Sequence, residues 1–219
     1  MFNWSSIPIV FPKIVDGLQM TILIAVLGIL AGFIIGVCAG YIRTTKSKVL
    51  SSIAAFYVWI IRSTPIIVQA LYIYFVIPRM LDISFNREIA GILCISINAS
   101  AYISEIVRGA LNEVPKGQWE AGYSLGMNKF QILFHLIFPP AFKSMLPALG
   151  NQFIITIKDT AILTVIGVAE MTYQAGQYAA TSFNLVESYT LLALFYLVLI
   201  SILTILLSAL EKKMGVDRR

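Results

Sequence analysis

Long, predominantly apolar segments constrain this chain more than any other feature. About 20 such residues in a helix cross the hydrocarbon core of a bilayer. Segments of at least that length cover residues 14–41, 49–77, 88–111, 132–168 and 188–210. Only 12% of the residues are charged, about half the usual share of a soluble domain. The sequence therefore predicts an all-α, polytopic membrane bundle of five spanning helices, forming one domain over residues 1–219.

The polar residues exclude two other classes of function. The formal charge is +5, but the basic residues form short clusters between apolar segments instead of one basic stripe, so nucleic-acid binding is not expected. The chain has two cysteines and one histidine, too few for a Cys/His metal site. Cys38 and Cys94 are therefore expected to be small buried side chains, and no metal site is predicted.

The distribution of lysine and arginine predicts an orientation in the membrane. Basic residues are concentrated in segments 43–48, 108–143 and 212–219. The expected connection at residues 78–87 carries two arginines and an aspartate, and the expected loop at residues 170–187 has no basic residue. Because loops rich in Lys and Arg stay in the cytoplasm, we expect the N-terminus outside the cell and the C-terminus in the cytoplasm.

Two features inside the predicted helices bear on packing. Gly28, Gly32, Gly36 and Gly40 recur every four residues, which places them on one face and allows another helix to approach closely. The alternative interpretation of that face is a path for substrate. The second feature is the sequence Arg-Ser-Thr-Pro at residues 62–65, which interrupts the second apolar segment and exposes backbone polar groups within it.

The polar segment at residues 112–140 predicts local structure on the cytoplasmic side. Residues 119–125 suit a short helix, and Gly126 suits its C-terminal stop. Asn128 is a good N-cap for a second helix toward Ile137. Pro139 and Pro140 are expected to fix the chain before it re-enters the membrane. The segment is either an ordinary structured loop or a docking platform for a cytoplasmic partner.

One motif in this segment is specific. Glu120-Ala121-Gly122, three residues, Gly126, nine residues and then residues 136–139 (Leu-Ile-Phe-Pro) resemble the EAA motif of ABC-importer permeases. That motif reads Glu-Ala-Ala, three residues, Gly, nine residues and Ile-x-Leu-Pro. Further segments resemble the polar amino-acid permeases of this group, and they are residues 62–69, 98–108, 117–121, 146–151 and 158–160.

The resemblance implies a type I importer core with five helices per subunit and two permease subunits, either identical or similar. A cytoplasmic dimer of ATP-binding cassette subunits would bind ATP and Mg and hydrolyse the ATP. An extracytoplasmic binding protein would deliver substrate. This chain would be no enzyme, would hold no cofactor and would lie in the bacterial cell membrane as a multi-pass protein. The implied coupling residues are Glu120, Ala121, Gly122, Gly126 and Met127.

An amino-acid substrate needs cationic or N–H donors for its carboxylate and an acceptor for its ammonium group. Arg62 or Lys158 could bind the carboxylate, and Glu105 or Asp159 the ammonium. The alternative is that these charges pair with one another, since unpaired charges within a membrane are costly. Glu105, with Arg108, could also simply lie at the membrane interface. The full set of candidate substrate-binding residues is Arg62, Ser63, Thr64, Gln69, Asn98, Tyr102, Lys158, Asp159 and Thr160.

The residue three positions before Arg62 bears on the class of substrate. Some permeases of this group place an acid three residues before the arginine of the Arg-x-Thr-Pro motif, which suits a cationic amino acid, whereas this chain has Trp59 there. We therefore expect a polar amino acid or cystine. The competing functions are a secondary transporter, an intramembrane enzyme and a membrane scaffold, and none of the three explains the docking segment.

Overall fold

The computed structural model describes residues 4–215, and this part of the chain contains helices and no strands. The α-helices are α1 (Ile7–Ile42), α2 (Lys48–Ser63), α3 (Ile66–Leu71), α4 (Ile77–Leu81), α5 (Arg87–Glu113), α6 (Lys116–Ser124), α7 (Lys129–Ile132), α8 (Phe138–Asp159), α9 (Met171–Ser182) and α10 (Leu185–Lys213). Two short 3-10 helices, η1 (Trp4–Ser6) and η4 (Thr160–Ile166), and two π-helical turns, η2 (Tyr72–Val76) and η3 (Leu133–Ile137), complete the fold. The predicted all-α class is confirmed.

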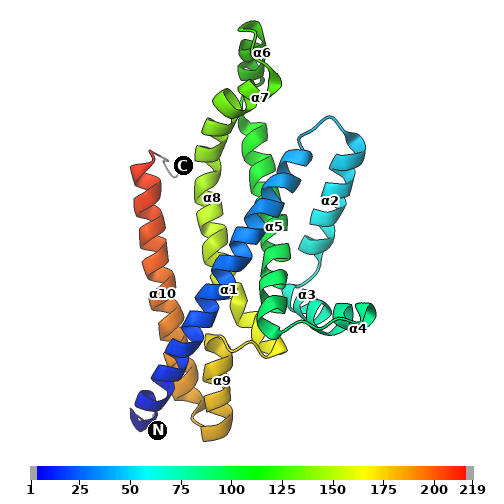
Figure 1. Cartoon of the computed structure of the whole chain (residues 1–219). Helices are drawn as coiled ribbons and strands as arrows, with labels where there is room; N and C mark the ends of the chain where they lie inside the picture. The colour runs from blue at the N-terminus through cyan, green and yellow to red at the C-terminus, as the bar shows by residue number, and fades with distance from the viewer. Residues whose placement is uncertain (1–3, 216–219) are drawn as a thin grey trace.

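Four continuous helices are long and apolar enough to cross a membrane, and they cover Trp4–Ile42, Arg87–Glu113, Lys129–Ile166 and Leu185–Lys213. The pair Lys48–Ser63 and Ile66–Leu81 is long and apolar enough to form a fifth crossing if its two halves, bent by 103°, make up one span. Figure 1 shows the start of α1 at one end of the bundle and α6 with the end of α10 at the other. Five crossings were expected, with the second one interrupted; the structure has four continuous candidates, and the bent pair falls where the interruption was expected.

The glycine face of α1 packs against α5. A Cβ atom at Gly36 would lie 2.7 Å from the backbone oxygen of Ser100, and one at Gly40 would lie 2.8 Å from that of Ser104. A Cβ atom at Gly28 or Gly32 would also lie within 3.0 Å of an atom of α5, in residue 95 or 96. The packing interpretation is therefore confirmed, and α5 fills the face that was the alternative candidate for a substrate path.

The core lies where α5 meets α1, α3 and η4. Ile24, Cys94, Ile95 and Leu163 are buried there in one apolar cluster. The expectation for the two cysteines is thus half correct: Cys94 is buried, but Cys38 is exposed on α1. Cys38 lies two residues after Gly36 and two before Gly40, so the face that packs on α5 turns its side chain outward.

Two further expectations need correction. Residues 170–187 were expected to be a loop, but they contain the helix α9, whose N-cap is Glu170. Pro139 and Pro140 do not separate a cytoplasmic helix from a membrane helix, because the chain is continuously helical from Lys129 to Ile166. The π-helical turn η3 just before Pro139 explains this, since a wider turn moves away the carbonyls that a proline ring would otherwise meet. The turn η2 precedes Pro78 in the same way.

Candidate functional site

The break between α2 and α3 is held by the side chain of Gln69. At Thr64 and Pro65 the backbone is extended, with φ/ψ of −108°/134° and −60°/138°. The buried amide of Gln69 donates to the backbone oxygen of Ile61 at 2.7 Å and to that of Thr64 at 3.0 Å. Carbonyls at the end of a helix have no partner within it, so Gln69 satisfies groups that the break would otherwise leave free.

The same amide links the break to α5. Asn98, buried on α5, donates from Nδ2 to Oε1 of Gln69 at 3.2 Å. The thiol of Cys94, one turn earlier, lies 3.8 Å from the backbone oxygen of Ile66. The α2–α3 break is therefore fixed against the middle of α5, and Thr64, Gln69 and Asn98 form one hydrogen-bonded group.

Glu105 of α5 binds three arginines. Its Oε1 accepts from Arg43 at 3.0 Å and from Arg62 at 3.2 Å, and its Oε2 accepts from Arg108 at 2.8 Å. These arginines come from the end of α1, the end of α2 and α5 itself. Glu105 thus joins three helices. For Glu105 and Arg62 the structure shows the alternative in which the charged side chains pair with one another.

This cluster carries an excess of positive charge. Three guanidinium groups meet one carboxylate, which gives a formal charge of +2. The guanidinium of Arg62 also lies over the ring of Tyr102, 5.4 Å from its centroid, a distance suited to a cation–π interaction. The side chain of Arg62 is 45% exposed, so its remaining N–H donors are accessible.

The remaining candidates lie apart from this cluster. Lys158 and Asp159 end α8, and among residues 4–215 neither forms a salt bridge. The hydroxyl of Thr160 is buried and donates to the backbone oxygen of Ile157, so it is engaged within its own helix. Ser63 is exposed at the break. Since η4 packs against α3, the end of α8 approaches the break from the side opposite α2 (Figure 1).

Sequence reasoning missed two residues. Arg43 was interpreted only as a positive charge in a cytoplasmic loop, although it is the closer of the two guanidiniums on Oε1 of Glu105. Glu170 is fully buried and accepts from the backbone N–H groups of Thr172 and Tyr173. An acid before a segment of small and polar residues was the available signal of a helix N-cap there.

The polar segment at residues 112–140, called the docking segment below, has the helix stop predicted at Gly126. The N–H of Met127 donates to the oxygen of Gly122, and the N–H of Gly126 to that of Tyr123, the pattern of a Schellman C-cap. Gly126 has a φ of +74°, which a glycine adopts without strain. Asn128 then forms a complete capping box with Gln131. Helix α6 begins at Lys116, three residues before the predicted start.

The implied coupling residues divide into buried and exposed positions. Gly122 is buried, and a Cβ there would lie 2.6 Å from Cγ1 of Ile132, which explains why this position has glycine where the motif has its second alanine. Glu120, Ala121 and Gly126 are exposed, and Met127 is half-buried. Leu125 is 77% exposed at the tip. Figure 1 shows α6 as the outermost element at its end of the bundle.

Known proteins match both the sequence and the fold. A family model described as the binding-protein-dependent transport system inner membrane component covers residues 28–216. The glutamine transport system permease protein GlnP of Escherichia coli (strain K12) is 40% identical over 216 residues, which cover 98% of this chain and 99% of the relative. The arginine transport system permease protein ArtQ of Bacillus subtilis (strain 168) is 34% identical over 203 residues, covering 93% of each chain.

A solved structure described as an amino acid ABC transporter with histidines has a TM-score of 0.90 and 33% identity, and the match covers 97% of this chain and 99% of that one. The relatives are transport permeases, which confirms the expectation that this subunit is no enzyme. The chain therefore belongs to the family of binding-protein-dependent transport system inner membrane components, as an amino-acid ABC-importer permease.

Proposed function

We propose that this subunit forms the translocation pathway of an ATP-driven importer for a neutral polar amino acid. The observation that carries the proposal is the α2–α3 break, where Arg62, Asn98 and Tyr102 surround a helix interruption within a membrane crossing. Substrate sites of membrane transporters lie at interrupted helices, and at this break the carbonyls of Ile61 and Thr64 already accept from Gln69, so side chains are left to bind the substrate. We propose a bacterial inner-membrane location with the N-terminus outside, following the distribution of basic residues.

Recognition of the substrate carboxylate is assigned to Arg62. Glu105 neutralises only one of the three guanidiniums, and Arg62 keeps accessible donors beside the break. A carboxylate would accept charge-assisted hydrogen bonds from it.

A neutral side chain fits the charge of the site better than a cationic one. The arginine cluster has a formal charge of +2, and a cationic substrate would be repelled by it. Trp59 offers no carboxylate in place of the acid that suits cationic substrates. The 40% identity to a glutamine permease also favours a neutral substrate. Glutamine is therefore the first substrate to test, followed by other neutral polar amino acids and cystine.

Coupling to ATP is assigned to α6. Its tip exposes Leu125 and Tyr123, and aromatic side chains are enriched at protein–protein contacts. The proposed partner is a cytoplasmic ATP-binding cassette dimer, which would bind ATP and Mg. A second permease subunit, identical or similar, and an extracytoplasmic binding protein complete the proposed importer.

The test is purification of the tagged chain with its copurifying subunits, combined with glutamine uptake in proteoliposomes. Gly126→Asp places a side chain at a φ of +74° and should abolish uptake and recovery of the ATPase. Gly117→Ala, also on α6 and with open space around it, should leave both intact. Arg62→Gln should lower uptake at least tenfold while the ATPase is still recovered.

Each part of the proposal has its own refuting result. Full ATPase recovery and uptake with Gly126→Asp would refute the coupling assignment. Normal uptake with Arg62→Gln would refute the substrate assignment. Preferential uptake of arginine over glutamine by the unaltered transporter would overturn the argument from charge.

A further inference from the structure

Two cavities lie next to each other where α1, α5, η3 and α8 meet. The larger is a groove of about 320 Å³ whose lining is almost entirely apolar and includes Phe33, Cys38, Phe134 and Phe142. The smaller is a pocket of about 180 Å³ closer to α6. Tyr41, Leu111 and Leu133 line both. The two cavities therefore adjoin along these three side chains, and together they present an apolar end and a polar end.

The apolar end opens sideways from the bundle. The groove is bounded by α1, α5 and α8, all parts of membrane-spanning helices. Four of the phenylalanines that line it are exposed, Phe134 to 60%. Exposed apolar walls between helices of spanning length would contact acyl chains when the bundle lies in a bilayer.

The polar end offers hydrogen-bond donors and one positive charge. Lys129, Asn112 and Trp119 line the small pocket. Within residues 4–215, the side chains of Lys129 and Asn112 form no hydrogen bond or salt bridge, so their donors are available. Thr44 and Thr45 also line it, but their hydroxyls donate to the backbone oxygens of Tyr41 and Ile42. No aspartate or glutamate lines either cavity, so the pocket suits an anionic group.

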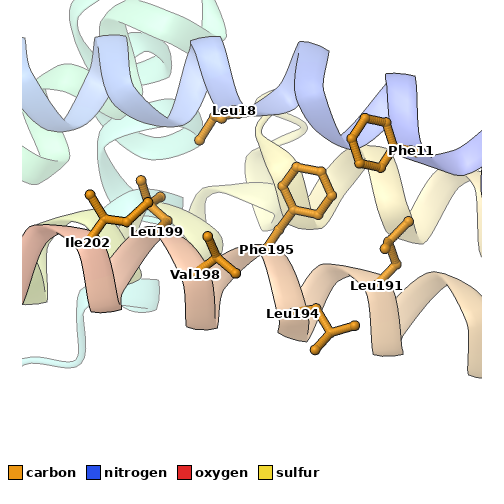
Figure 2. Close-up of a pocket in the computed structure, with 8 residues that line it drawn as sticks. All are labelled: Phe11, Leu18, Leu191, Leu194, Phe195, Val198, Leu199 and Ile202. Atoms are coloured by element: carbon orange, nitrogen blue, oxygen red, sulfur yellow. The ribbon is translucent and has the colours of Figure 1, made fainter.

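A second groove provides a contrast. It lies between α1 and α10, has a volume of about 400 Å³ and is lined by eight apolar residues. Figure 2 shows these side chains, among them Phe11, Leu194 and Phe195, with no polar group between them. This groove can accommodate hydrocarbon, but it has nothing to distinguish one lipid headgroup from another.

We propose that these two adjoining cavities next to α6 together bind one anionic phospholipid. An acyl chain occupies the groove beside Cys38, and the phosphate-bearing headgroup lies against Lys129 and Asn112. Basic pockets between spanning helices recognise anionic headgroups, and the lysine stem can run along the apolar wall while its ammonium reaches the headgroup. This inference goes beyond the proposed transport function and does not depend on which amino acid is carried.

The small pocket would also place the lipid headgroup in contact with α6 and its neighbouring helices. The pocket is lined by Trp119 of α6, Lys129 of α7 and Tyr41 of α1. A bound headgroup would therefore contact the short docking helix and two helices that hold it. Occupancy of the site would stabilise α6 relative to the bundle, because a ligand stabilises the state that binds it.

The experiment is native mass spectrometry of the transporter purified through a tag on this chain. The added probe is either palmitoyl-oleoyl phosphatidylglycerol or palmitoyl-oleoyl phosphatidylcholine. The unaltered protein should retain phosphatidylglycerol in preference. Lys129→Gln should reduce that preference about fivefold, since one basic residue near a membrane surface contributes that much to anionic-lipid binding. Lys129→Arg should preserve it.

A matched pair of variants tests the groove itself. Cys38→Trp fills the groove next to α6, and Leu194→Trp adds the same bulk to the groove between α1 and α10. Cys38→Trp should remove the retained phosphatidylglycerol, and Leu194→Trp should not. The proposal is overturned if the unaltered protein shows no preference, if Lys129→Gln keeps it, or if both tryptophan variants lose lipid equally. The readout is bound mass, so it stays independent of uptake and of ATPase recovery.

Discussion

Replacing Gly36 by alanine is expected to force α1 and α5 apart where their backbones approach closely. The added Cβ would lie 2.7 Å from both the backbone oxygen of Ser100 and Cβ of Ile103. Neither atom can move by a side-chain rotation, so the helices themselves must separate by several tenths of an ångström. Overpacking of this kind costs about 1–3 kcal/mol. For a chain of this size, a cost of about 2 kcal/mol lowers the melting temperature by about 4–8 °C.

The buried thiol of Cys94 can report the melting temperature of the protein. Cys94 is buried and Cys38 is exposed, so a Cys38→Ala background leaves one thiol that reacts with a maleimide dye only on unfolding. Gly109→Ala is the matched control, because no atom lies within 4 Å of a Cβ there and alanine favours a helix. The control should melt at the same or a higher temperature. Equal melting of Gly36→Ala and Gly109→Ala would refute the argument that glycine is required for this contact.

Three further changes test other contacts in the same thermal assay. Glu105→Gln leaves three arginines without their carboxylate and should cost about 1–3 kcal/mol, while Glu120→Gln, exposed on α6, should leave the melting temperature unchanged. Gln69→Leu removes the donor to two backbone carbonyls and should also cost about 1–3 kcal/mol. Burial raises the pKa of Glu170, between η4 and α9, to about 7, although the backbone N–H bonds of residues 172 and 173 oppose the rise. The folded state then binds a proton at Glu170 more tightly than the unfolded chain does. The free energy of unfolding should therefore be greatest below about pH 4 and fall as the pH rises to 7, by on the order of 3 kcal/mol. Glu170→Gln should make the melting temperature nearly independent of pH between pH 5 and 8, and an unchanged pH dependence in this variant would contradict the assignment.

The parts of the fold that depend on neighbouring residues could be predicted from the sequence. The spanning helices follow from apolar segments, the break from Thr64-Pro65 and the helix stop from Gly126. The glycine repeat in α1 predicted a close helix contact, though it could not identify α5 as the partner. Each of these is a property of residues within about one helix length of one another.

The contacts between distant residues could not be predicted. Arg43 and Glu105 are 62 positions apart, and nothing in either segment indicates that α1 and α2 end beside the same carboxylate. Glu170 lies in a segment without a basic residue, so it was interpreted as loop, whereas its carboxylate is an N-cap. The helical path through Pro139 depends on the π-helical turn before it, and a shift of one hydrogen bond in a helix has no clear signal in a single sequence.

The continuous helix from Lys129 to Ile166 has a mechanical consequence. At 1.5 Å per residue, its 38 residues measure roughly 57 Å, and Figure 1 shows them running from beside α6 to the level of α3. No loop interrupts this path, so under the coupling proposed for α6 a displacement there would travel along one helix to the level of α3. The π-helical turn η3 lies near the α6 end, and its irregular hydrogen bonding makes it the place where this helix would bend.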